Sequence, residues 1–74
     1  MDVRRRVGLN VKRFRAERGL SQEELAFECG LDRTYVSGVE RGVRNPTVVV
    51  LEKIAKALEV ATSLLLEERS GSKK

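Results

Sequence analysis

A chain of 74 residues makes one small domain at most, and such a chain buries only about 60% of the surface that its unfolded form exposes. Its single cysteine excludes an intramolecular disulfide, and without histidine one thiol cannot form a structural zinc site, so self-association is the remaining source of added stability. The net charge of +4 suggests a polyanionic partner, although a solvated basic surface would give the same balance.

Residues 3–18 are predicted to form the first helix. Val7, Val11 and Phe14 recur at the i, i+4, i+7 spacing that places side chains on one helical face. Gly19 follows as a candidate for the left-handed residue that ends the helix. No alternating apolar run is flanked by hairpin turns, so we expect helices throughout the chain.

The second helix is predicted to open at Ser21. The Ser21 hydroxyl can cap the backbone of Glu24 while the Glu24 side chain reaches back, the reciprocal capping box. Gly30 is expected to end this helix. Its apolar face consists of Leu25, Ala26 and Cys29.

The third helix is predicted over residues 32–41, with Asp32 as its N-cap. Only Val36, Val39 and part of Tyr35 could hold this helix to a core. Most of its surface is therefore free to contact a partner.

The fourth helix can start at Thr47 or Asn45, since Pro46 suits a first helical turn. It carries a broad apolar stripe made of Val48, Leu51, Ile54, Ala55 and Leu58. A short fifth helix is predicted over about residues 62–68. We expect an all-α fold of five short helices in one domain, residues 1–69, followed by a disordered tail, residues 70–74.

Residues 21–41 satisfy the size constraints of a helix-turn-helix. A small residue stands where the two helices cross, and the turn contains a glycine followed by an apolar residue. Apolar residues also stand where the second helix packs against the first. The residues concerned are Leu25, Ala26, Cys29, Gly30, Leu31, Val36 and Val39.

Four stretches carry a resemblance to a known family: "LSQEELA", "YVSGVERG", "RNP" and "LEKIAKAL". Over about residues 7–66 the chain resembles the lambda-repressor-like, Cro/Xre-type helix-turn-helix proteins. The segment "DRTYVSGVERG" is also similar to the controller proteins of restriction–modification systems, a subgroup of small dimeric regulators. The resemblance implies double-stranded DNA as the partner.

The face of the third helix opposite its two valines should read DNA bases. Advancing about 100° per residue places Thr34 and Ser37 on that face and Arg33 at its edge. Arg33 is our first choice, because a guanidinium pairs bidentately with guanine. The alternative for Arg33 is a merely solvated arginine.

Gly38 also falls on this outward face. A glycine within a helix costs roughly 0.5–1 kcal/mol relative to alanine, so some contact should require it. Our hypothesis is that it lets the helix approach the groove wall closely. The alternative is close packing against the loop around Val43.

Contacts with the DNA backbone are expected around the rim of this face. Gln22 lies at the start of the second helix, where free backbone N–H groups favour an anion, and the resemblance also places a phosphate-binding glutamine there. Tyr35 could serve either core packing or DNA contact. Other candidates are Arg41, Arg44, Asn45 and Arg13.

Two further sets of residues have structural roles in this interpretation. The resemblance implies a structural ion pair between Arg15 and Glu40, with solvated charges as the alternative. A two-fold dimer interface is expected in the C-terminal third, where the alternative is that the same residues only enlarge the core. The interface candidates are Val49, Val50, Leu64 and Leu66.

We therefore expect a sequence-specific DNA-binding transcriptional regulator that binds a two-fold operator as a homodimer. The alternatives are an antitoxin or phage-type repressor, or a helical protein-interaction module that keeps the fold without binding DNA. We do not expect the protein to be an enzyme. Cys29 is its one strong nucleophile, and the apolar position of this residue predicts an inert core thiol. We also expect no metal, cofactor or small-molecule ligand. With no signal peptide and no apolar run of roughly 20 residues, the expected location is cytoplasmic, without a membrane partner.

Overall fold

The computed structural model describes residues 2–68, and this part of the chain forms five α-helices and no strand. The helices are α1 (Val3–Glu17), α2 (Gln22–Cys29), α3 (Arg33–Glu40), α4 (Val48–Leu58) and α5 (Thr62–Leu66). The predicted all-α fold of five helices is confirmed, with helix bounds that differ from the predicted ones by one or two residues. The predicted tail, residues 70–74, lies outside the described residues. Between residues 2 and 68, no helix has both the length and the apolar character to cross a membrane.

The ends of α2 and α3 are determined by local hydrogen bonds. The Ser21 hydroxyl accepts from the backbone N–H of Glu24 at 3.0 Å, and the Glu24 carboxylate accepts from the backbone N–H of Ser21 at 2.8 Å. Gly30 then takes a left-handed φ of 69°. The Asp32 carboxylate accepts from the backbone N–H of Thr34 at 3.0 Å and so starts α3. These are the caps that the sequence predicts, and they define the turn between the two helices.

The start of α4 resolves the choice between Thr47 and Asn45. Thr47 is the N-cap, because its hydroxyl accepts from the backbone N–H of Val50 at 3.1 Å. The placement of Pro46 in the first helical turn is therefore wrong, since Pro46 precedes the cap. Asn45 and Pro46 belong to the loop that follows α3.

Asp2 caps α1, and its pKa is well below the ordinary value for a carboxyl group. Its carboxylate accepts from the side chain of Arg4 and from the Arg4 backbone N–H, the latter at 2.7 Å. These two hydrogen bonds, the side-chain one first, lower the pKa of Asp2 from 3.8 to about 2. Asp2 therefore stabilises α1 because its folded state binds a proton less readily than its unfolded state.

We expect this stabilisation to be complete above pH 3.8 and to disappear as the pH falls through about 2. An NMR titration of the side-chain carboxyl carbons should show Asp2 titrating near pH 2. The variant Asp2→Asn should lose this part of the acid dependence of stability. A midpoint at the ordinary carboxyl value would contradict the hydrogen bonding to Arg4.

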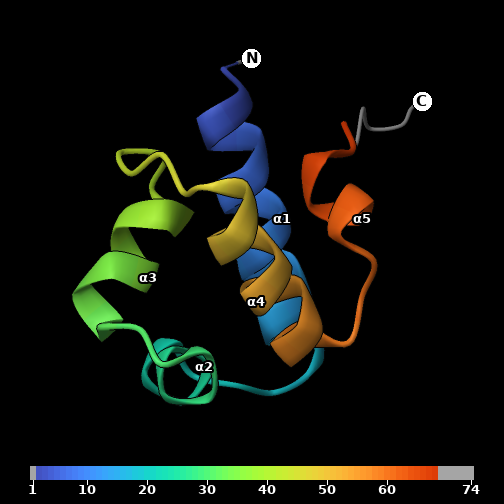
Figure 1. Cartoon of the computed structure of the whole chain (residues 1–74). Helices are drawn as coiled ribbons and strands as arrows, with labels where there is room; N and C mark the ends of the chain where they lie inside the picture. Colours follow the sequence, from blue (N-terminus) through green and yellow to red (C-terminus); the bar gives the residue numbers. More distant parts are fainter. Residues whose placement is uncertain (1, 69–74) are drawn as a thin grey trace.

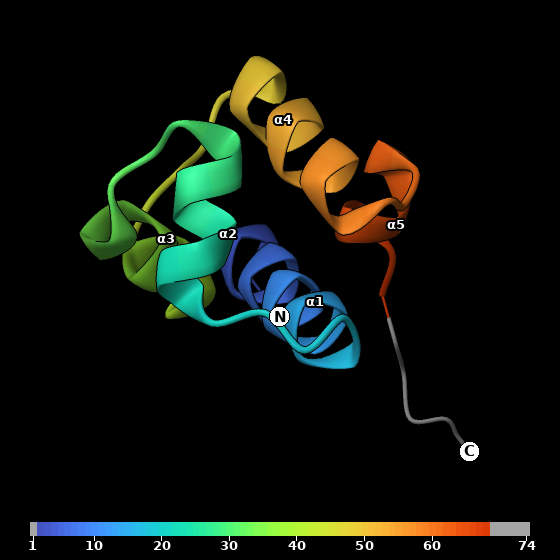
Figure 2. The ribbon, with the colours of Figure 1, turned by 90° about the horizontal axis from the view of Figure 1, so that it is seen from below.

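Around the core, α1 packs against α3 on one side and α5 on the other, while α4 crosses in front of it and α2 lies below (Figures 1 and 2). The third helix thus lies at the edge of the molecule with one face toward solvent. The buried apolar residues come from all five helices. They are Val7, Val11, Leu25, Ala26, Cys29, Val36, Val39, Leu51, Ile54, Ala55, Leu58 and Leu65.

Gly8 lies where α1 and α3 are in tight contact. A Cβ at Gly8 would collide with the carbonyl oxygen of Val39 and would lie 2.6 Å from that of Glu40. Only glycine allows the last turn of α3 to lie this near to α1. The role of Gly8 was not predicted from the sequence, although a glycine inside a predicted helix and next to the core residue Val7 indicates such a contact.

Asn10 is a buried polar residue that ties α1 to α5. Its side-chain amide donates to the carbonyl oxygens of Leu65 at 2.9 Å and Glu67 at 2.8 Å. Its role was not predicted from the sequence either. The signal was a polar residue inside the apolar stripe of Val7 and Val11.

We expect Asn10→Ala to lower the free energy of unfolding by about 1–2 kcal/mol, because the carbonyl of Leu65 would stay buried without its donor. Urea denaturation followed by circular dichroism measures this loss. Asn10→Asp should cost at least as much, since a carboxylate cannot donate to carbonyls. If Asn10→Ala unfolds at the wild-type urea concentration, the amide does not anchor α5.

Candidate nucleic-acid interface

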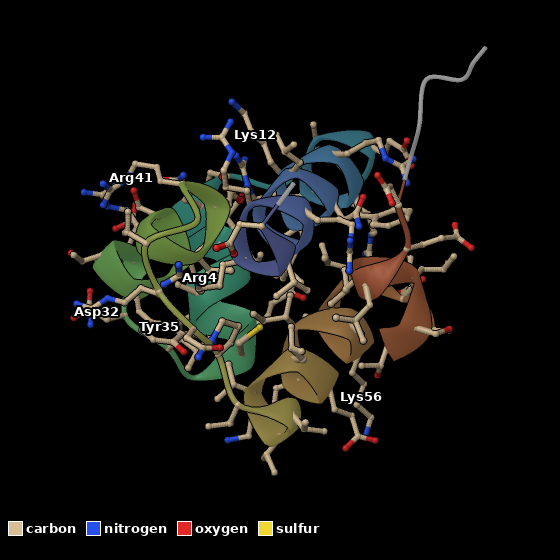
Figure 3. The ribbon with its side chains drawn as sticks, turned by 90° about the horizontal axis from the view of Figure 1, so that it is seen from above. Arg4, Lys12, Asp32, Tyr35, Arg41 and Lys56 are labelled. Carbon is tan, nitrogen blue, oxygen red and sulfur yellow. The ribbon has the colours of Figure 1, made fainter. Side chains whose placement is uncertain are left out.

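The two faces of α3 differ sharply in burial. Val36 and Val39 are 0% and 1% exposed, so they hold the helix to the core. On the opposite side Arg33 and Thr34 are exposed and Ser37 is half-buried. The structure thus leaves the three proposed base-reading residues accessible on the outer face of α3, the side away from its valines. The helix itself lies at the edge of the molecule in Figure 3.

The turn between α2 and α3 holds the two helices in a defined geometry. The backbone N–H of Leu31 donates to the carbonyl of Ala26 at 2.8 Å, which closes the turn after Gly30. Cys29 is buried beside it, and its thiol lies 3.7 Å from the carbonyl oxygen of Lys53. Burial raises the pKa of the Cys29 thiol, with a smaller contribution from the nearby carboxylate of Glu28. The protonated thiol is a poor nucleophile, and its place in the core gives it a packing role.

Arg15 and Glu40 form a bidentate ion pair that joins α1 to the end of α3. Arg15 Nε donates to Glu40 Oε2 at 2.6 Å and Nη2 donates to Oε1 at 3.0 Å. The Glu40 side chain is only 3% exposed. The hydrogen bond to Glu40 raises the pKa of Arg15, with burial acting in the opposite direction. An acidic residue on α3 is thereby neutralised and kept away from the outer face.

Gln22 extends this network toward the outer face. Its amide nitrogen donates to Glu40 Oε1 at 2.9 Å, and its amide oxygen accepts from Arg33 at 3.4 Å. The network therefore runs from Arg15 through Glu40 and Gln22 to Arg33. Gln22, which the sequence analysis places against a phosphate, is half-buried and also orients the first candidate base-reading residue.

Gly38 packs against the loop that follows α3, which supports the packing alternative over close approach to the groove wall. Gly38 is buried, and the nearest atoms to a Cβ at that position belong to the Arg44 side chain, with Cγ at 2.5 Å. The loop after α3 folds back over this turn, so the packing alternative describes the contact. A helical wheel places Gly38 outward correctly but contains no information about a loop that covers it.

The other residues proposed to contact the DNA backbone differ in how accessible they are beside the outer face of α3. Arg41 is exposed and donates to the Ser37 hydroxyl at 3.4 Å, and Figure 3 shows it pointing outward at the end of α3. Tyr35 is half-buried below Arg44, and Asn45 is exposed in the loop. Arg13 is directed elsewhere, because it stacks over Phe14 and pairs with Glu17 on α1.

The residues suggested for a dimer interface are only partly available. Val49 and Leu66 are exposed, whereas Val50 and Leu64 are half-buried. Leu66 lines a small hollow of about 150 Å³ shared with the first turn of α1, Pro46 and Leu51. Val48, which is 77% exposed at the start of α4, was not among the predicted interface residues because its spacing matches the core stripe.

Comparison with known proteins agrees with this geometry. The family model HTH_3, described as helix-turn-helix, matches residues 11–65. The uncharacterized HTH-type transcriptional regulator y4dJ of Sinorhizobium fredii is 49% identical over 61 residues, covering 82% of this chain and 79% of that protein. The control protein C.BamHI of Bacillus amyloliquefaciens is 46% identical over 67 residues, covering 89% of this chain and 83% of that protein.

A solved structure shows that the similarity extends from the sequence to the fold. The restriction–modification controller protein C.Esp1396I, a tetramer in complex with its natural 35 base-pair operator, has a TM-score of 0.79 and 43% identity. The match covers 88% of this chain and 86% of that chain. Both the predicted family and the similarity to controller proteins are confirmed: the chain belongs to the HTH_3 helix-turn-helix family, of the Cro/Xre type.

Proposed function

We propose that this chain is a sequence-specific DNA-binding transcriptional regulator with α3 as its recognition helix. The observation that carries the proposal is the division of α3 into a buried valine face and an accessible face with Arg33, Thr34 and Ser37. An α-helix fits the major groove, where an arginine reads guanine bidentately and a threonine methyl contacts thymine. The net charge of +4 favours a polyanion.

The DNA backbone would be contacted at the rim of the same face. Arg41 and Asn45 are exposed at the end of α3 and in the loop after it. Gln22 at the start of α2 and the hydroxyl of Tyr35 complete the proposed phosphate contacts. These residues come from separate elements, so together they would fix the orientation of α3 in the groove.

The operator is proposed to be two-fold symmetric and bound by a homodimer. A single small helix-turn-helix offers few contacts, and a dimer reads two half-sites about 34–36 Å apart. Exposed Val49 and Leu66 support an interface formed by α4 and α5, to which exposed Val48 is now added. The helical residues 3–66 would act as one domain. The regulator would work in the compartment that holds the DNA, which is the cytoplasm in bacteria such as those that carry the two relatives.

Selection of binding sites from random DNA, followed by gel shifts in a salt series, tests this function. We expect a palindromic motif and a fall of log affinity with log salt at about −0.9 per neutralised phosphate. Arg33→Ala should weaken binding to the motif by roughly 5- to 150-fold. Lys56→Ala is the matched control, since Figure 3 shows Lys56 on α4 away from α3. Selection that returns no motif would rule out the regulator.

One observation favours the alternative, a protein-interaction module. Phe27 on α2 is 86% exposed and lies among the carboxylates of Glu23, Glu24 and Glu28. If the module explanation holds, DNA binding will show neither a motif nor a salt slope, and Phe27→Ser will be the variant that changes function. An antitoxin or phage-type repressor would bind DNA in the same way as the proposed regulator.

A further inference from the structure

A glycine is needed at position 38 because of a close contact with Arg44, and not because of the backbone conformation there. Its φ is helical, so alanine could adopt the same backbone. However, the three atoms nearest to a Cβ at Gly38 are Arg44 Cγ at 2.5 Å, Nε at 3.4 Å and Cδ at 3.5 Å. The missing side chain of Gly38 therefore provides the space that the stem of Arg44 occupies.

The backbone of the loop after α3 holds Arg44 in this position. The carbonyl of Gly38 accepts from the N–H groups of Val43 at 3.0 Å and Arg44 at 3.2 Å. Gly42, with a left-handed φ of 78°, turns the chain back over α3. The side chain of Arg44 consequently starts above the helix that it covers.

The guanidinium of Arg44 ends on the outer face of α3. Its Cζ lies 5.8 Å from the centroid of the Tyr35 ring, a cation–π distance. Arg44 itself is exposed. The side chain of Arg44 thus runs from Gly38 to the ring of Tyr35, over a part of α3 that has no side chain of its own at position 38.

We propose that Arg44 is a sequence-discriminating residue of the DNA interface and that Gly38 is the residue that positions it. This inference deepens the proposed function and rests on it. A guanidinium held above the recognition face by Gly38 and Tyr35 presents a planar pair of donors, which suits the two acceptors of guanine. A phosphate contact alone would need only the charge of Arg44 and not its position over Gly38.

Binding-site selection from random DNA with the wild type, Arg44→Lys, Arg44→Ala and Gly38→Ala tests the proposal. Arg44→Lys keeps the charge but loses the bidentate geometry. We expect all three variants to lose the preference at the same base pair of each half-site, by roughly 5- to 150-fold, while the rest of the motif is retained. Gly38→Ala combined with Arg44→Ala should discriminate no worse than Arg44→Ala alone, because both changes act on one side chain.

Two results would overturn the proposal. Arg44→Lys with the wild-type motif would show that Arg44 contacts only phosphate, and Gly38→Ala with the wild-type motif would show that Gly38 does not position it. Lys56→Ala should leave the motif unchanged and controls for loss of one positive charge. If the wild type itself selects no motif, the proposed function fails and the inference fails with it.

Thermal melting gives a second, independent measurement of the contact. In the Arg44→Ala background the space above Gly38 is open, so Gly38→Ala should raise the melting temperature by about 2–8 °C, the ordinary gain of replacing a helical glycine. In the wild-type background the same change should give a smaller gain or a loss. Equal gains in both backgrounds would contradict the contact between Gly38 and Arg44.

Discussion

Glu40→Ala is expected to lower the free energy of unfolding by about 3–5 kcal/mol. The change leaves Arg15, whose side chain is only 15% exposed, without the carboxylate that accepts two of its hydrogen bonds. It also removes the acceptor for the amide of Gln22. A chain of 74 residues has roughly 4–11 kcal/mol of stability in all, so the variant should lose a large part of it and unfold at a much lower urea concentration than the wild type.

Urea denaturation of Glu40→Ala measures this loss, and Glu17→Ala is the matched control. Glu17 pairs with Arg13 at 3.2 Å, but its side chain is 59% exposed, so its removal should cost less than about 1 kcal/mol. Arg15→Met combined with Glu40→Leu should recover much of the loss, because no charge is then left buried. If Glu40→Ala is no less stable than Glu17→Ala, the pair does not hold α3 to α1.

Features that depend on neighbouring residues could be predicted from the sequence. The capping box of Ser21 and Glu24, the left-handed Gly30 and the cap at Asp32 each involve atoms within a few residues, and all three are observed. The valine face of α3 also follows from helical periodicity alone. The accessible face opposite it was therefore predictable before any tertiary contact was known.

Features that depend on tertiary packing could not be predicted in the same way. Helical periodicity assigns Gly38 to the outward face of α3, but it does not give the path of the loop that brings Arg44 over this residue. The role of Asn10 depends on the carbonyls of Leu65 and Glu67, 55 and 57 residues away. Tertiary packing decides both cases, across one loop for Gly38 and between distant segments for Asn10, and helical periodicity does not encode it.

The close contact at Gly8 leads to the second large effect. We expect Gly8→Ala to lower the free energy of unfolding by about 3 kcal/mol, the upper end for added bulk in a packed core, because the new Cβ meets backbone atoms of Val39 and Glu40 that no rotamer change can move aside.

Because these atoms belong to the last turn of α3, the shift that relieves the collision moves the proposed recognition helix. Affinity for a selected operator should therefore fall more than affinity for unrelated DNA, since base contacts need accurate placement and phosphate contacts tolerate small shifts. Ala16→Leu adds bulk to an exposed position of the same helix and should change stability by less than about 0.5 kcal/mol. Melting temperatures and gel shifts on both DNAs measure the two effects, and a Gly8→Ala protein that melts above the wild type would show that α1 and α3 are not in tight contact there.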